Sequence, residues 1–201
     1  MTVKKSIMLP IVTILVITVI LLAASFGLNG IAAQKAQADH IWLMQTLLPD
    51  STEFTLEPYT GEDANIRSVH RADNGFVIET VTYGYAGDIT MFIGVSNEGK
   101  VTGLVVRDLS ETFGLGREAL TDHVFLAQFL NSSGSFEVAT GSADAFSGAT
   151  AEVTEATGET VEVDALTGAT VTSKAIVRAV NSAVAYVTGA DAVSAATSWG
   201  G

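Results

Sequence analysis

Residues 160–187 read TVEVDALTGATVTSKAIVRAVNSAVAYV, which combines a β-like piece, a glycine-containing turn and a long amphipathic segment. The apolar residues of the long segment recur at the spacing of one helical face: Ile176, Val180, Ala183, Val184 and Val187. The pattern predicts a strand over 160–163 and a helix over about 172–187. The turn between them therefore lies at the amino end of a helix.

This turn has the composition of an anion site. Gly168 lets the backbone approach a ligand closely. Four residues supply hydroxyl groups: Thr167, Thr170, Thr172 and Ser173. The unpaired N–H groups of a helix start and the positive end of its dipole favour an anion, and Lys174 adds a cationic side chain. We predict phosphate binding here, and ordinary N-capping by Thr172 or Ser173 with nothing bound is the alternative.

Upstream of this turn, residues 75–106 alternate like a half-buried antiparallel sheet. The runs 75–83 and 89–95 are followed by a turn at residues 97–99 and by a third β-rich run over 101–106. Runs of this kind joined by a short glycine-containing turn predict antiparallel hairpins.

The segments on either side of this sheet differ in character. Residues 117–131 carry apolar positions at helical spacing, whereas residues 50–74 are polar and rich in turn-forming residues. We therefore predict an α+β fold, a small antiparallel-sheet domain with flanking helices.

An apolar segment near the amino terminus predicts a membrane anchor. Residues 6–28 contain no charged side chain, and as a helix rising about 1.5 Å per residue they would cross a hydrocarbon core of about 30 Å. A cleaved secretory signal is the alternative, but the apolar core of such signals usually has about 7–15 residues. Lys4 and Lys5 precede the segment and only Lys35 follows it closely, so we expect a cytoplasmic amino terminus.

The expected layout of the chain has five parts. They are a cytoplasmic terminus over 1–5, one transmembrane helix over 6–28, a juxtamembrane helix (31–48) with a linker over 29–74, an extracytoplasmic domain over 75–189 and a flexible tail over 190–201.

Composition excludes several kinds of function. The net charge of −12 and the lack of a Lys or Arg run exclude nucleic-acid binding. The chain has no cysteine, which excludes disulfides, thiolate-ligated clusters and Cys-based zinc sites. His40, His70 and His123 show no metal-ligand spacing, and we find no pattern of a catalytic base or nucleophile.

The turn at 164–173 resembles a known family, the RnfG/NqrC family of FMN-binding subunits, which belong to the Rnf complex and to the Na⁺-pumping NADH:quinone oxidoreductase. In that family a flavin transferase that uses FAD attaches FMN through its phosphate to the last Thr of the core in D-x-x-[ST]-G-A-T-x-[ST]. By position, Asp164 opens the motif and Thr170 is the attachment residue. The resemblance implies that their neighbours also contact FMN: Thr167, Gly168, Ala169, Val171, Thr172, Ser173 and Lys174.

Two further segments carry the resemblance. The family segment E-T-P-G-L-G, which lies against the flavin, is matched by Glu111, Thr112, Phe113, Gly114, Leu115 and Gly116, with Phe113 in place of the proline. Tyr85, in the turn at residues 84–87, matches the family's G-Y-x-G and is a further expected cofactor contact.

A second near-match to the core lies twenty positions upstream, at residues 144–150. Its Thr150 is followed by Glu152 and Glu155, whose charges oppose a phosphate, and by Gly158 before a stable helix can form. Charge and structure both favour Thr170, and Thr150 stays open as a decoy or a second modified site.

The resemblance implies an electron-carrying subunit of a cell-membrane Rnf-type translocase, which links ferredoxin and NAD to Na⁺ or H⁺ movement. Its partners would be the other membrane subunits and, transiently, the flavin transferase. No independent catalytic site is expected. The alternatives are the corresponding FMN-binding subunit of the quinone reductase, a stand-alone anchored flavoprotein, and an adhesion module in which residues 131–173 are a surface stalk.

Overall fold

A computed structural model describes residues 13–21, 35, 37–109, 123–139, 157–166 and 168–189. The chain forms two compact units, Met1–Leu43 and Met44–Gly201. In the first unit, residues 13–21 are helical, and most of the apolar segment 6–28 lies outside the described residues. Within the described ranges, no helix combines the length and the apolar character that crossing a bilayer requires. The predicted terminus 1–5 and tail 190–201 also lie outside the described residues.

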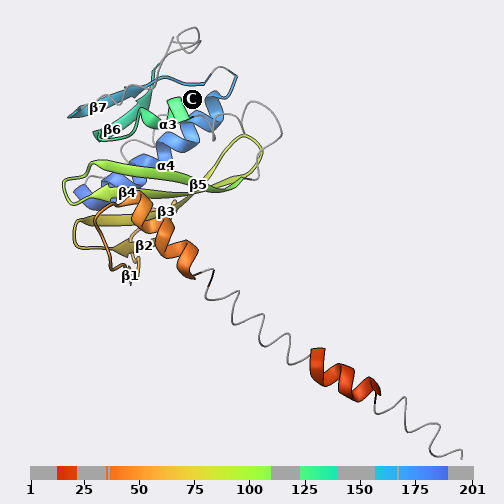
Figure 1. Ribbon diagram of the computed structural model, residues 1–201. Helices are drawn as coiled ribbons and strands as arrows, with labels where there is room; N and C mark the ends of the chain where they lie inside the picture. Colours follow the sequence, from red (N-terminus) through yellow and green to blue (C-terminus); the bar gives the residue numbers. More distant parts are fainter. Residues whose placement is uncertain are drawn as a thin grey trace, which may run out of the picture. The chain divides into compact units, whose positions relative to one another are not determined.

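An antiparallel sheet in the order β1-β2-β3-β4-β5 forms one layer of the second unit (Figure 1). Its strands are β1 (Thr55–Glu57), β2 (Ile66–Arg71), β3 (Gly75–Tyr83), β4 (Asp88–Ser96) and β5 (Val101–Leu109). The predicted hairpins are confirmed, and Gly99 adopts a φ of 80° in the turn between β4 and β5. Residues 50–74 were predicted to be rich in turns, and this prediction missed β1 and β2. Both strands are short, β1 pairs with β2, and β2 pairs with the longer β3.

A second layer completes the α+β domain. It contains α3 (His123–Ala127), the parallel pair β6 (Ser133–Val138) and β7 (Thr157–Val163), and α4 (Thr170–Thr188). The long helix α4 contacts β6 on one side and β3 and β4 on the other, so it lies between the two sheets (Figure 1). A short turn connects the end of β7 to the start of α4.

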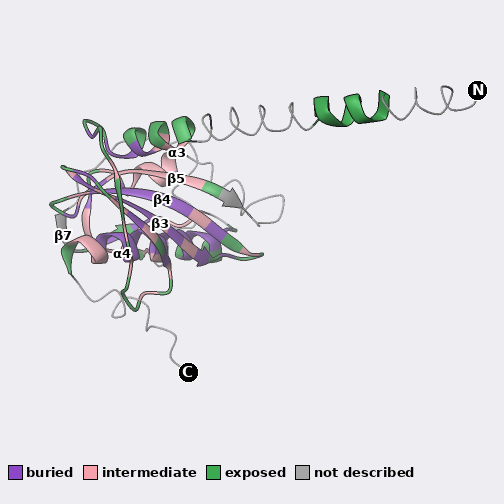
Figure 2. Cartoon of the chain, turned by 90° about the horizontal axis from the view of Figure 1, so that it is seen from below, coloured by how far each residue is buried: buried purple, intermediate pink, exposed green. Residues whose placement is uncertain are grey.

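The apolar face predicted for α4 forms the centre of the core. Ile176, Val180 and Ala183 are fully buried, and Figure 2 shows buried residues along α4, β3 and β4. The opposing side chains come from both layers: Ile78, Met91, Ile93, Phe125, Phe129 and Phe136. Burial of this stripe on two sides fixes the helix in the domain.

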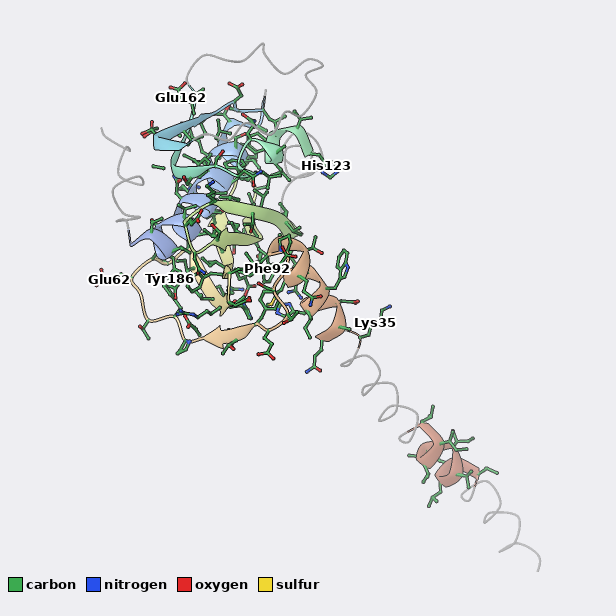
Figure 3. The ribbon with its side chains drawn as sticks, turned by 60° about the vertical axis from the view of Figure 1, so that its left-hand side comes forward. Lys35, Glu62, Phe92, His123, Glu162 and Tyr186 are labelled. Carbon is green, nitrogen blue, oxygen red and sulfur yellow. The ribbon has the colours of Figure 1, made fainter. Side chains whose placement is uncertain are left out.

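The far end of α4 is held by an aromatic cluster. The Tyr186 ring meets Tyr59 and Phe76 edge to face at 5.9 and 5.7 Å between centroids. Burial, followed by the nearby carboxylate of Glu57, raises the pKa of Tyr186. Figure 3 shows Tyr186 toward one end of the domain and Glu162 of β7 at the other, so this cluster lies away from the start of α4.

The helix predicted over 117–131 ends earlier in the structure. Residues 117–122 lie outside the described residues, and α3 ends at Ala127. Asn131 adopts a φ of 58°, and its N–H donates to the Val101 carbonyl at 2.8 Å. Backbone pairing with the start of β5 therefore replaces the last helical turn, and the chain continues into β6, a Ser- and Gly-containing strand that the sequence pattern did not indicate.

The second face of the large sheet is covered by residues 44–48. Residues 37–47 are helical within the predicted range 31–48, and Met44, Leu47 and Leu48 are buried together with Phe92. The Thr102 hydroxyl donates to the Leu47 carbonyl at 2.6 Å. Gly94 and Gly103 are paired across β4 and β5, and both lie against Leu47. Two small residues at this point let a helical turn approach the strands closely.

We predict that Gly94→Ala destabilises the domain. A Cβ at this position would lie 2.3 Å from the Leu47 carbonyl oxygen, a backbone atom that cannot move aside without shifting the turn. Overpacking of this kind costs about 1–3 kcal/mol of unfolding free energy, measured by urea denaturation. Gly103→Ala is the control, because its nearest contacts would be 3.1 Å and its loss should be smaller. Equal losses in both variants would contradict this packing.

Candidate functional site

The helix α4 starts at Thr170 without a side-chain cap. Its N-cap residue is Ala169, and among the described residues no side chain bonds the first turn in the manner of a cap. Gly168 has a φ of 78°, a conformation that favours glycine and turns the chain into the helix. The alternative of N-capping by Thr172 or Ser173 therefore does not describe this start, because both residues lie inside the first turn. The first N–H groups of α4 have no partners within the helix.

The hydroxyls of the first turn take different directions. Thr170 is exposed, and Lys174, also exposed, lies four residues on along the same face. The side chain of Thr172 is 1% exposed, and its hydroxyl oxygen has no hydrogen-bond partner among the residues that the structure describes. Thr170 and Lys174 are thus the groups of this turn that an approaching phosphate can reach.

Ser173 is used inside the turn. Its hydroxyl is fully buried, donates to the Ala169 carbonyl at 3.0 Å and accepts the Leu166 N–H at 3.3 Å. These two bonds close the turn onto the helix. Ser173 therefore shapes the site, whereas the sequence motif predicts it as a cofactor contact.

Hydrogen bonds tie α4 to the end of β3. The Thr82 hydroxyl donates to the Ala175 carbonyl at 3.0 Å, and Arg178 Nη2 donates to the Tyr83 carbonyl at 2.8 Å. Farther along the helix, the Asn65 side-chain amide donates to the Ser182 hydroxyl at 3.1 Å. Asn65 itself lies next to β3, because its carbonyl accepts the Val81 N–H. The helix therefore runs antiparallel to β3.

This direction brings the start of α4 level with the turn at residues 84–87. One helical turn back from Ala175 leads to Val171, about 6 Å along the helix axis. Two residues on from Thr82 lead to Gly84, about the same distance along the strand. Gly84 donates to the Gly87 carbonyl at 2.8 Å and closes that turn, which carries Tyr85. Val171, which shares a helix face with Ala175 and Arg178, lies on the side of this turn.

Large apolar side chains are exposed at this end of the domain. Among the described residues of the second unit, four such side chains are exposed: Leu56, Tyr83, Tyr85 and Val171. Tyr85 belongs to the β3–β4 turn and Val171 to the first turn of α4, whereas Tyr83 alternates with Thr82, whose hydroxyl bonds α4, and so lies on the other face of the sheet. An exposed apolar surface beside a phosphate site suits the ring system of a phosphorylated cofactor.

The carboxyl end of β5 lies at the same end of the sheet as the turn at residues 84–87. Leu109 pairs with Ile89, which in turn pairs with Thr82. Several expected contacts follow shortly after Leu109 and lie outside the described residues: Glu111, Thr112, Gly114, Leu115 and Gly116. Thr167 and the near-match at 144–150 also lie outside the described residues.

A contact that sequence reasoning missed holds Asp164. The side-chain amide of Gln128 accepts the Asp164 N–H at 2.9 Å and donates to the Asp164 carbonyl at 3.4 Å. The two residues are 36 positions apart, and no motif or period connects them. Within the described ranges, His, Asp and Glu side chains form no cluster that could hold a metal.

The residues present fit a phosphate-linked cofactor. They offer an uncapped helix start, an exposed hydroxyl, a neighbouring ammonium group and an apolar surface. This strand-to-helix turn is therefore the candidate site for a phosphorylated aromatic cofactor.

The family model of the FMN-binding domain matches residues 84–185, just over half of the chain. The chain belongs to this family, and FMN is therefore its cofactor. The match begins at the Tyr85 turn and ends within α4, so it spans both halves of the site. Among curated proteins, no sequence matches this chain.

We predict that Thr172→Val leaves the stability of the flavin-free protein unchanged or slightly raised. The substitution removes a buried hydroxyl that has no partner in the described part of the chain, so no hydrogen bond is lost. Thr82→Val is the matched control, because its hydroxyl bonds the Ala175 carbonyl, and it should lose about 1 kcal/mol in urea denaturation. A Thr172→Val loss as large as that of the control would show that the hydroxyl is already bonded.

Proposed function

We propose that this chain is the electron-carrying subunit of a membrane Rnf-type complex, with FMN joined through its phosphate to Thr170. One observation supports this most directly: in a member of the FMN-binding domain family, the Thr of the attachment motif stands exposed at the uncapped start of α4. When bound, FMN supplies the reversible electron transfer that no side chain of this cysteine-free protein provides.

The attachment is a transfer reaction in which Thr170 is the acceptor. The Thr170 oxygen attacks the phosphorus on the FMN side of FAD, and the bond from that phosphorus to the AMP oxygen breaks. The products are the Thr170 phosphoester, AMP and the proton released from the hydroxyl. A flavin transferase is the transient partner that catalyses this step.

The surrounding residues then hold the ester. The free N–H groups and the positive dipole end of α4 stabilise the phosphate charge, and Lys174 adds a cation from the next helical turn. Val171 and Tyr85 give the ring an apolar surface. Asp164 and Gly168 shape the loop, and Gly168 does so through its positive φ.

The proposed membrane anchor explains why a covalent bond to the cofactor would be useful. We propose that residues 6–28 span the cell membrane once and that the flavin domain lies outside the cytoplasm. A covalent ester keeps the cofactor where no pool of free flavin replaces it. The anchor keeps the flavin near the other membrane subunits, which are the expected electron partners in coupling to Na⁺ or H⁺ movement.

We predict that, of Thr170 and Thr150, Thr170 is the residue that carries the covalent flavin. The chain is produced with a flavin transferase, membranes are washed with alkaline carbonate, and the denatured protein is viewed in a gel under ultraviolet light. Wild type and Thr150→Val should give a fluorescent band in the membrane pellet, and Thr170→Val should give none. Fluorescence that survives in Thr170→Val and disappears in Thr150→Val would overturn the attachment site. A band found in the wash would contradict the anchor.

A further inference from the structure

Two side-chain amides in this domain clamp backbone in the same way. Gln128 bonds both the N–H and the carbonyl of Asp164, at 2.9 and 3.4 Å. Asn181 bonds both the N–H and the carbonyl of Phe136, each at 2.8 Å. Both amides are partly buried. The first clamp holds the residue that opens the attachment motif, and the second holds the middle of β6.

The position of Gln128 is fixed by its neighbours. Phe125 and Phe129 are fully buried in the core and meet edge to face at 5.6 Å between ring centroids. The Gln128 backbone N–H and its side-chain Nε2 both contact the Phe125 carbonyl, at 3.3 and 3.4 Å. The amide therefore projects from a well-packed turn, and its bonds hold the Asp164 backbone at a fixed position relative to the core.

The loop before Thr170 is consequently held at both ends. Gln128 holds its first residue, Asp164, and the buried Ser173 hydroxyl holds Leu166 and Ala169. Thr170 directly follows this loop. In the sequence of the second near-match, the position corresponding to Ser173 is Val153, which has no hydroxyl for such a bond.

We propose that Gln128 is a positioning residue for flavin attachment: its clamp on Asp164 sets the loop so that the Thr170 hydroxyl meets the transferase-bound FAD in a reactive orientation. This inference rests on the proposed attachment at Thr170. Gln128 touches neither the hydroxyl nor the phosphate. Its effect is on orientation, and a displacement of about 1 Å in a reacting group can slow a reaction by roughly a hundredfold.

The test is the initial rate of covalent flavin incorporation into the full chain, followed by intact mass with purified flavin transferase and excess FAD. Gln128→Met keeps the side-chain volume and removes both hydrogen bonds to Asp164, as well as the contact of Nε2 with the Phe125 carbonyl, so its rate should fall roughly tenfold to a hundredfold. Asn181→Leu is the matched control, because it removes an equivalent clamp away from the motif, and its rate should stay within about twofold of wild type. Gln128→Glu keeps the acceptor for the Asp164 N–H but, while ionised, sets a carboxylate oxygen against the Asp164 and Phe125 carbonyls, so its rate relative to wild type should rise as the pH falls.

Rates are compared at a temperature at which circular dichroism shows every variant folded. The inference is overturned if Gln128→Met reacts at the wild-type rate, or if Asn181→Leu slows as much as Gln128→Met, since the effect would then reflect stability. It is also overturned if the rate of Gln128→Glu relative to wild type does not rise as the pH falls. A wild-type chain that accepts no flavin would instead refute the attachment at Thr170, and the inference with it.

Discussion

The start of α4 presents backbone N–H groups that neither the helix itself nor a side-chain cap from the described residues satisfies. Such groups need water or a ligand, and together with the helix dipole they favour an anion. The rest of the helix is fixed by burial between two sheets, so this end cannot turn inward to find a partner. The exposed Thr170 hydroxyl sits directly beside these donors. The proposed attachment at Thr170 rests on this helix end.

The rest of the domain holds that end in place from three directions. The apolar stripe of α4 is buried against the core. Thr82 and Arg178 bind the helix to the end of β3, which places the Tyr85 turn beside the first helical turn. Gln128 and Ser173 hold the incoming loop. These four polar side chains all bond a backbone carbonyl or N–H, and the site geometry is therefore set mainly by the backbone.

Sequence patterns predicted the parts of this structure that depend on local periodicity. The buried face of α4 and the β3–β4–β5 meander follow from spacings of 3.6 and 2, and both are confirmed. The strands β1, β2 and β6 were missed because they are short or polar and owe their conformation to pairing with other segments. The helix over 117–131 was overextended because Asn131 pairs with Val101 instead. Gln128 could not be found, since its bond to Asp164 depends on tertiary packing.

The most direct test of this account is the intact mass of the chain purified from cells that contain a flavin transferase, with the modified residue located by fragmentation. The account predicts the mass of the unmodified chain plus one FMN less one water, with the added mass on Thr170. A chain that carries only the mass of its own amino acids would contradict the covalent site, and an added mass confined to another residue would contradict the role of the α4 start.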